Sequence, residues 1–191
     1  GEILDYLKRT GLDKNTIVVY TTDQGFYLGE HGWFDKRFMY EESFGMPMVM
    51  RWPGHIKPGT QVTGLTQNID FAPTFLDMCG ISIPQDMQGV SFKELVEKGK
   101  TPRDWRKSLY YHYYEFPGFH SVRAHYGVKM ERYKLMHFYV DDNWELYDIK
   151  TDPEEMHNLY GKKGMEKITT ELKAELARLQ KEYDVPQELC R

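Results

Sequence analysis

The spacing of hydrophobic and polar residues changes near the middle of the chain. Residues 1–10 carry apolar side chains at helical spacing and end at Gly11, which is a typical helix stop. Residues 15–23 are then a continuous β-branched and aromatic run, as in a strand buried on both faces of a parallel sheet. A short strand at 47–54 and a helix at 68–81 follow. This first part therefore has an α/β pattern.

Beyond residue 100 the apolar side chains recur at every second position. This period predicts a small antiparallel sheet. Its four predicted strands are 108–115, 120–126, 132–140 and 144–150. Residues 151–159 have the cap, proline and glutamate of a short helix start. Apolar side chains every three or four positions within 165–184 predict a long amphipathic helix that covers one face of the sheet.

We therefore expect an α/β protein in two parts. Residues 1–100 hold a portion of an α/β sheet, and residues 101–191 form an α+β subdomain with a four-stranded antiparallel sheet and a long C-terminal helix. No initiator Met and no signal peptide precede the first helix. We expect the chain to begin inside a larger protein, so that its targeting information is missing.

Composition narrows the classes of function. The formal net charge is −4, with 25 basic and 29 acidic residues, which argues against nucleic acid or an anionic membrane surface as the partner. The longest apolar runs are far shorter than the roughly 20 residues that span a bilayer. Cys79 and Cys190 have no CxxC spacing, so neither zinc nor a redox motif is indicated, and we expect Cys79 in the core.

Aromatic residues make up 15% of the chain, 14 of them tyrosines, and they are dense in "LYYHYYEFPGF" at 109–119. Such stripes usually serve packing. Aromatic faces also line sugar sites, so a carbohydrate-binding surface stays open as an alternative.

Candidate chemistry begins where the first strand ends, at Asp23 and Gln24. The carboxyl ends of strands in an open parallel sheet are common ligand sites. A carboxylate and an amide oxygen are hard donors suited to Ca²⁺ or Mg²⁺. Both side chains can reach one ion only if the backbone turns, and Gly25 supplies that freedom. The alternative interpretation is that Asp23 merely forms a turn.

His31 and Lys36 follow in the Gly-bounded loop "GEHGWFDK". A divalent ion and a nearby lysine together form a clamp for a tetrahedral oxyanion. Taken singly, Lys36 would be a solvated surface lysine and His31 a loop-capping residue.

An ordered series of motifs resembles one family. The stretch "TIVVYTTDQGFYLGEHGWFDKRFMYEESFGMPMVMRWPG" is followed by "QNIDFAPTFLDMCGI", "MQGVSF", "RYKLMHF" and "WELYDIKTDPEEMHNL". Through nearly all of its length the chain is similar to the C-terminal half of type I sulfatases, formylglycine-dependent enzymes of the alkaline phosphatase-like superfamily. The details most resemble bacterial enzymes that act on sulfated sugars, including N-acetylglucosamine-6-sulfatases and iduronate-2-sulfatase-like members.

The resemblance implies a role for each matching residue. Asp23 and Gln24 match the acid and amide that give oxygens to Ca²⁺, although many members carry Asn at the second position. Lys36 matches the lysine that contacts the sulfate and stabilises charge on the ester oxygen. His31 matches a histidine at the mouth of the pocket.

Three residues of the C-terminal sheet fall where such enzymes often reach toward the sugar. They are His120, Arg123 and His125 in "FHSVRAHYG". Ordinary strand residues are the alternative for all three.

The family's nucleophile motif, C/S-x-P-x-R, and its N-terminal Asp-Asp metal pair do not occur in the sequence. We expect a fragment of a sulfatase without turnover of its own, which needs the missing N-terminal part and binds calcium weakly. The implied substrate is a sulfated carbohydrate, and the implied location is the periplasm or the exterior of a bacterium. The rival functions are a phosphatase or phosphodiesterase of the same superfamily and a non-catalytic carbohydrate-binding module.

Overall fold

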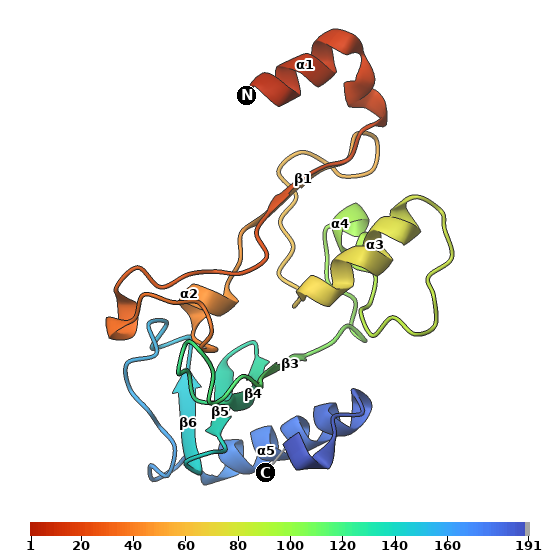
Figure 1. Cartoon of the computed structure of the whole chain (residues 1–191). Helices are drawn as coiled ribbons and strands as arrows, with labels where there is room; N and C mark the ends of the chain where they lie inside the picture. Colours follow the sequence, from red (N-terminus) through yellow and green to blue (C-terminus); the bar gives the residue numbers. More distant parts are fainter. Residues whose placement is uncertain (190–191) are drawn as a thin grey trace. The chain divides into compact units, whose positions relative to one another are not determined.

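The computed structural model describes residues 1–189, which fold into two compact units (Figure 1). One unit contains Gly1–Asp23 and Met46–Trp105, and the other contains Gln24–Gly45 and the chain from Arg106 onward. The sequence-based division at residue 100 stays a prediction. Segment 24–45 lies before residue 100 in the sequence but packs with the C-terminal sheet, which the sequence-based division does not include.

The first unit holds two short strands and three short α-helices. In chain order its elements are α1 (Glu2–Thr10), a 3-10 helix (Leu12–Asn15), β1 (Val18–Thr21), β2 (Met48–Arg51), a 3-10 helix (Asn68–Asp70), α3 (Phe71–Met78) and α4 (Lys93–Lys98). Helix α1 ends at Gly11 in the left-handed conformation, as the sequence predicts.

Strand β1 differs from its prediction. It pairs antiparallel with β2 in a sheet of two strands, and Tyr20 lies opposite Val49. Their side chains are 70% and 65% exposed. Burial on both faces of a parallel sheet is therefore not found in the described chain, because β1 has one neighbouring strand and no second layer there.

The core of the first unit lies around Phe92, Leu95 and Met78. Thr74 links α3 to this core, because its hydroxyl donates to the Asp70 carbonyl and accepts the Phe92 N–H. Cys79 is exposed, which contradicts its predicted place in the core. It caps the C-terminal end of α3, where the chain turns away from the packed face. Cys190 lies outside the described residues.

The second unit contains the predicted four-stranded antiparallel sheet. Its strands are β3 (Ser108–Tyr113), β4 (His125–Met130), β5 (Tyr133–Phe138) and β6 (Asn143–Asp148), in that order across the sheet. The predicted strand at 120–126 is wrong in its bounds. Residues 114–124 form a loop instead, and the last two residues before β5, Glu131 and Arg132, form a tight turn that the sequence analysis did not identify.

The short helix predicted at 151–159 is wrong. These residues form turns, and Glu155 has a φ of 51°, a left-handed conformation that cannot continue a helix. Asp152 still acts as a cap, since its carboxylate accepts the N–H groups of Met156 and His157.

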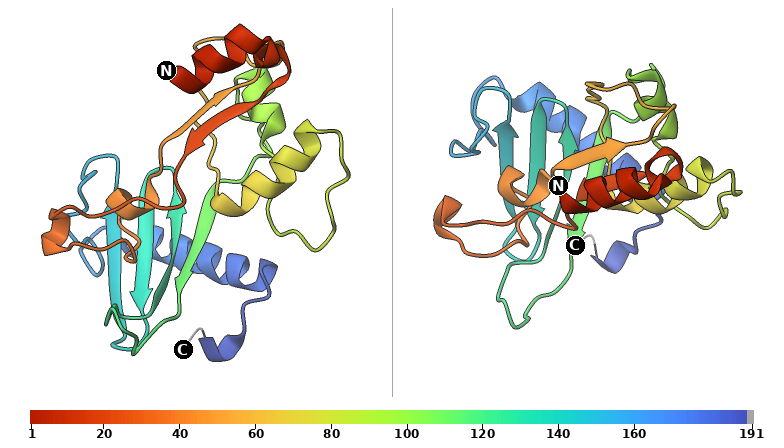
Figure 2. Two further views of the ribbon diagram at one scale, coloured as in Figure 1. Left: turned by 45° about the horizontal axis from the view of Figure 1, so that its top comes forward. Right: turned by 90° about the horizontal axis from the view of Figure 1, so that it is seen from above.

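Both faces of the four-stranded sheet are covered, as Figure 2 shows. Helix α5 (Glu166–Glu182) covers one face and buries Leu172, Leu176 and Leu179, as the sequence predicts. Segment 24–45, with the 3-10 helix Glu30–Gly32 and helix α2 (Glu41–Phe44), covers the other. A last 3-10 helix spans Gln187–Leu189.

Gly127 of β4 allows the close approach of segment 24–45. A Cβ at this position would lie 2.7 Å from the sulfur of Met39 and 2.5 Å from the Leu135 carbonyl oxygen. Among residues 1–189, no helix is both long enough and apolar enough to cross a bilayer.

Candidate functional site

Helix α2 brings two of the candidate residues to one hydroxyl group. Ser43, which is 1% exposed, donates from Oγ to the Lys36 carbonyl at 2.6 Å. The same oxygen accepts the Gln24 side-chain amide at 2.8 Å. Because the amide nitrogen is turned toward Ser43, the amide oxygen of Gln24 points the other way. Ser43 therefore fixes the orientation of Gln24 and the path of the backbone at Lys36.

The backbone next to Gln24 is held by the same helix. The N–H groups of Gly25 and Phe26 donate to the carbonyls of Ser43 and Glu42, both at 2.9 Å. A Cβ on Gly25 would lie 2.0 Å from the Glu42 carbonyl oxygen. Gly25 does not have the positive φ expected for a flexible turn. Space for a close approach, rather than backbone freedom, is the reason for glycine at this position.

Asp23 is the last residue of the first unit, and Gln24 is the first of the second. Asp23 is exposed; its carbonyl accepts the Asn68 side-chain amide at 2.5 Å, and its carboxylate accepts the Thr22 hydroxyl at 3.3 Å. Across the described residues, no three His, Cys, Asp or Glu side chains gather in a way that could hold a metal ion. The donor set of Asp23 and Gln24 fits a hard cation in chemistry, but Ca²⁺ takes six to eight oxygens.

Lys36 is half-buried between two anchored neighbours. Asp35 accepts the Lys36 N–H at 2.5 Å and pairs with Arg37 at 2.8 Å. The Arg37 carbonyl accepts the Tyr111 hydroxyl of β3 at 2.7 Å. The backbone of Lys36 is therefore fixed on both sides relative to the sheet.

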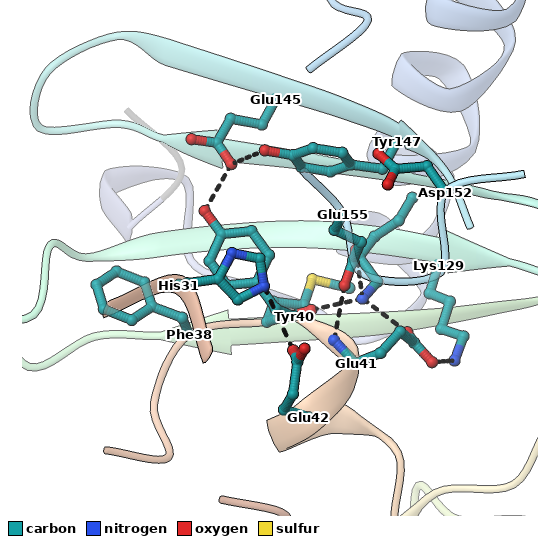
Figure 3. Close-up of polar contacts among 12 residues, drawn as sticks. His31, Phe38, Tyr40, Glu41, Glu42, Lys129, Glu145, Tyr147, Asp152 and Glu155 are labelled. Atoms are coloured by element: carbon teal, nitrogen blue, oxygen red, sulfur yellow. Dashed lines mark hydrogen bonds and ion pairs between the residues drawn. The ribbon is translucent and has the colours of Figure 1, made fainter. Parts of the chain in front are cut away.

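His31 lies against Tyr40 rather than in open solvent. Its ring stacks on Tyr40 with centroids 4.3 Å apart, and its Nε2 lies 3.4 Å from Glu42 Oε2 (Figure 3). His31 has a φ of 53°, so the loop is held in an unfavourable conformation there. Glu145 accepts the hydroxyls of Tyr40 and Tyr147 at 2.8 and 2.9 Å. Burial, with Glu145 beside it, raises the pKa of Tyr40, which therefore stays a neutral donor.

A group of four charged residues, two of them buried and two partly buried, is the feature that the sequence-based expectations lack. It consists of Glu41, Lys129, Lys134 and Glu155, and we call it the charge cluster. Lys134 is fully buried, and its Nζ lies 2.7 Å from Glu41 Oε1, 2.8 Å from Glu155 Oε1 and 2.7 Å from the Met39 carbonyl. Lys129 Nζ lies 2.7 Å from Glu41 Oε2. Figure 3 shows Glu41, Lys129 and Glu155 of this group between the sheet and α2.

The pKa values of the two carboxylates of the charge cluster are shifted in opposite directions. Burial raises the pKa of Glu41, but Lys134 and Lys129 outweigh burial and lower it overall. Burial raises the pKa of Glu155, and Lys134 only partly offsets the rise. Of the two carboxylates, Glu41 is therefore more firmly ionised than Glu155.

The three residues expected near the sugar lie in different surroundings. His120 and Arg123 are exposed on the loop between β3 and β4, where Arg123 pairs with Asp141 at 3.0 Å and lies over Phe116. His125 is fully buried at the start of β4. No hydrogen bond or ion pair joins these three to segment 24–45 within residues 1–189. Their assignment to the substrate stays a prediction.

His125 is enclosed by aromatic rings. Phe138 and Phe38 stack on it at 4.9 and 5.7 Å, and Nδ1 lies 2.8 Å from the Arg123 carbonyl. In the described part of the chain nothing hydrogen-bonds its Nε2. Burial lowers the pKa of His125 to about 4, so the ring is neutral at pH 7 and donates from Nδ1.

We predict that His125 makes the second unit sensitive to acid. A histidine whose folded pKa lies below its unfolded value of 6.5 stabilises the fold above pH 6.5, and this stability is lost as the pH falls toward 4. The loss is about 3 kcal/mol for a pKa near 4. His125→Phe should flatten the decline of the urea midpoint between pH 7 and pH 4.5. A decline as steep as in the unmodified protein would contradict the prediction.

His157→Gln is the matched control, because that side chain is 82% exposed. It should leave the pH dependence unchanged. Part of the decline should persist in His125→Phe, because burial also lowers the pKa of His112 to about 4.

Comparisons with known proteins identify the family of this chain. The family model for N-sulphoglucosamine sulphohydrolase, C-terminal, matches residues 29–182. N-acetylglucosamine-6-O-sulfatase of Bacteroides thetaiotaomicron is 55% identical over 185 residues, which are 96% of this chain and 33% of that protein. A solved structure of a protein in complex with its substrate D-glucosamine-2-N,6-O-disulfate superimposes with a TM-score of 0.93 at 54% identity, covering 96% of this chain and 38% of the other.

A third relative is the multifunctional alkaline phosphatase superfamily protein PehA of Trinickia caryophylli. It is 32% identical over 174 residues, covering 84% of this chain and 33% of that protein. The fold is thus that of the C-terminal portion of an alkaline phosphatase superfamily hydrolase. The chain belongs to the sulfatase family, within the group of N-sulphoglucosamine sulphohydrolase-like C-terminal regions. It spans about a third of the length of the curated relatives it matches.

Proposed function

We propose that this chain is the C-terminal part of a sulfatase that hydrolyses sulfate esters of sugars, with the 6-O-sulfate of a glucosamine as the first candidate. The observation that carries the proposal is 55% identity to an N-acetylglucosamine-6-O-sulfatase over 96% of the chain. The reaction is the cleavage of a sulfate ester by water to give the free sugar hydroxyl and sulfate.

Lys36 is proposed to bind the sulfate group and to stabilise the negative charge that grows on the ester oxygen as the bond breaks. A fixed ammonium is effective here because it need not reorganise during the reaction. The contacts of Asp35 and Arg37 support this role, since they fix the backbone of the chain at Lys36. His31, which is stacked on Tyr40, is proposed to lie at the mouth of the same pocket.

Asp23 and Gln24 are proposed to hold Ca²⁺, with the remaining oxygen ligands supplied from outside these residues. The bound cation would polarise the sulfate oxygens and lower the charge that the leaving alcohol must carry. Gln24 is oriented for this task, since its amide nitrogen is fixed by Ser43. His120, Arg123 and His125 remain proposed sugar-side residues.

The N-terminal part of the same polypeptide is the proposed partner of this chain. The sequence contains no C/S-x-P-x-R motif, so the formylglycine nucleophile would come from that part. Exposed apolar side chains on the first unit support the partnership, because Ile3, Tyr20 and Val49 are 75%, 70% and 65% exposed. By the resemblance to glycan-degrading bacterial enzymes, we also propose an exported or periplasmic location.

The proposal is tested by sulfate release. The protein that joins this chain to its N-terminal part should hydrolyse N-acetylglucosamine 6-sulfate in the presence of Ca²⁺ and lose the activity on chelation. The 191-residue chain alone should show no turnover of an aryl sulfate and only weak calcium binding. Turnover by this chain alone would refute the division of the site between two parts.

A phosphatase or phosphodiesterase is the second candidate, favoured by the 32% identity to PehA. Hydrolysis of a phosphate ester in preference to a sulfate ester, with two bound zinc ions, would support it. A carbohydrate-binding module without catalysis is less favoured, because Tyr110 and Tyr111 pack into the two cores of the second unit. Glycan binding by the whole chain without calcium would support that function.

A further inference from the structure

The sheet presents two lysines at directly opposed positions, Lys129 on β4 and Lys134 on β5. Like charges at such positions repel each other. The carboxylate of Glu41 lies between them, with Oε1 2.7 Å from Lys134 and Oε2 2.7 Å from Lys129. The pair therefore forms a binding place for one carboxylate of helix α2.

Glu155 holds the same helix at its first residue. Its Oε2 accepts the backbone N–H of Glu41, the first residue of α2, at 2.7 Å, and its Oε1 lies 2.8 Å from Lys134. Its φ of 51° is unfavourable for a residue with a side chain. The turn at 151–159 accepts this strain and aims a fully buried carboxylate at α2 and Lys134.

The contacts continue from α2 to the candidate site residues. Two carbonyls of α2 accept the N–H groups of Gly25 and Phe26, and the Ser43 hydroxyl binds both the Gln24 amide and the Lys36 carbonyl. Displacement of α2 by one ångström would therefore displace Gln24 and Lys36 together. Positions in an active site must hold to about half an ångström for full activity.

We propose that the charge cluster of Glu41, Lys129, Lys134 and Glu155 is a positioning device, which holds α2 on the sheet so that Ser43 orients Gln24 toward the cation and Lys36 toward the sulfate. The inference rests on the proposed function for the roles of Gln24 and Lys36. None of the four cluster residues is a catalytic residue, because each acts through α2.

A double variant tests the cluster without leaving an unpaired charge. Glu41→Gln/Lys129→Met removes one negative and one positive group and retains the pair of Lys134 with Glu155. Amide hydrogen exchange at Gly25 and Phe26 should accelerate at least about tenfold, while the amides of β5 should keep their rates. In the protein that joins this chain to its N-terminal part, the affinity for calcium should fall about 10- to 100-fold, which is the usual effect of removing a group that orients a metal ligand.

The matched control is Glu171→Gln/Lys167→Met on α5, where the same side chains form an exposed pair at 3.8 Å. It should change neither the exchange rates nor the calcium affinity. Ser43→Ala tests the last link and should weaken calcium binding by a similar factor with the cluster intact. Ser43→Thr, which restores the hydroxyl, should recover most of the affinity.

The outcomes separate this inference from the proposed function. Unchanged exchange at Gly25 and Phe26 in the cluster variant would overturn the inference, whatever the activity. Faster exchange throughout β5 as well would also overturn it, because the cluster would then serve stability alone. If the unmodified protein binds calcium but hydrolyses no sulfate ester, the proposed function fails, while the exchange and calcium measurements still decide the role of the cluster.

Discussion

Replacing Lys36 with methionine is expected to lower kcat for sulfate-ester hydrolysis by about 10²- to 10³-fold in the protein that joins this chain to its N-terminal part. Loss of the ammonium removes a fixed donor from the oxygen on which charge develops. The hydrogen bonds of the Lys36 backbone N–H and carbonyl do not depend on the side chain, so they should keep this segment in place in the variant. The measurement is the steady-state rate of sulfate release, with thermal unfolding alongside.

Lys167→Met is the control for this substitution, since that side chain is 90% exposed on α5. It should leave kcat and KM unchanged. A fall in kcat of less than threefold for Lys36→Met would show that Lys36 has no part in the reaction. A rise in KM alone would limit Lys36 to binding the substrate.

Replacing Lys134 with methionine is expected to destabilise the second unit by about 3–5 kcal/mol, the usual cost of removing one partner from a buried ion pair. The side chain is fully buried, and its loss leaves Glu41 and Glu155 facing each other without the cation between them. Hydrogen exchange of the β5 amides measures the free energy of unfolding of this unit.

A second substitution separates charge from packing. Adding Glu155→Gln to Lys134→Met should recover most of the lost stability, because Glu41 keeps Lys129 as its partner. A destabilisation below about 1 kcal/mol for Lys134→Met would mean that water or rearrangement satisfies the two carboxylates, and that the cluster contributes little.

The alternation of apolar and polar residues carried enough information for the four-stranded sheet and for α5. In 132–140, for example, the apolar Tyr133 and Leu135 alternate with the polar Arg132 and Lys134. The same stretch also contains a second signal. A lysine in line with Met136 on a strand buried on both faces must have an acidic partner, and the stretch "YEES" at 40–43 supplies Glu41.

Long-range contacts account for the errors. The residues around Glu155 have the local pattern of a helix start. The Glu155 carboxylate, however, forms an ion pair with Lys134 and accepts the N–H of Glu41 in α2, and these contacts favour a left-handed turn. Strand β1 has the composition of a buried strand, yet Tyr20 is exposed. Composition indicates the environment for which a strand is suited, but it does not indicate which neighbouring elements are present. Local patterns contain neither kind of information.

The candidate site was predicted mainly by motif resemblance, and the structure adds how its residues are held. Spacing alone could not show that Gln24 and Lys36 meet at one hydroxyl, because Ser43 had no feature that set it apart from a surface serine. His125 likewise read as an ordinary polar residue near a sugar, and only the packing of Phe38 and Phe138 shows that it is enclosed.

The cover on one face of the four-stranded sheet comes from residues 24–45, which lie in the sequence between the paired strands β1 and β2. The polypeptide is therefore interlaced: it leaves one unit after Asp23, returns at Met46, and leaves again after Trp105. No single cut in the chain separates the two units intact. Cleavage at residue 105 would separate Met136, Phe138 and Tyr147 from the apolar side chains of segment 24–45 that cover them. Insertions and exchanges of modules during evolution must therefore respect three crossing points at once.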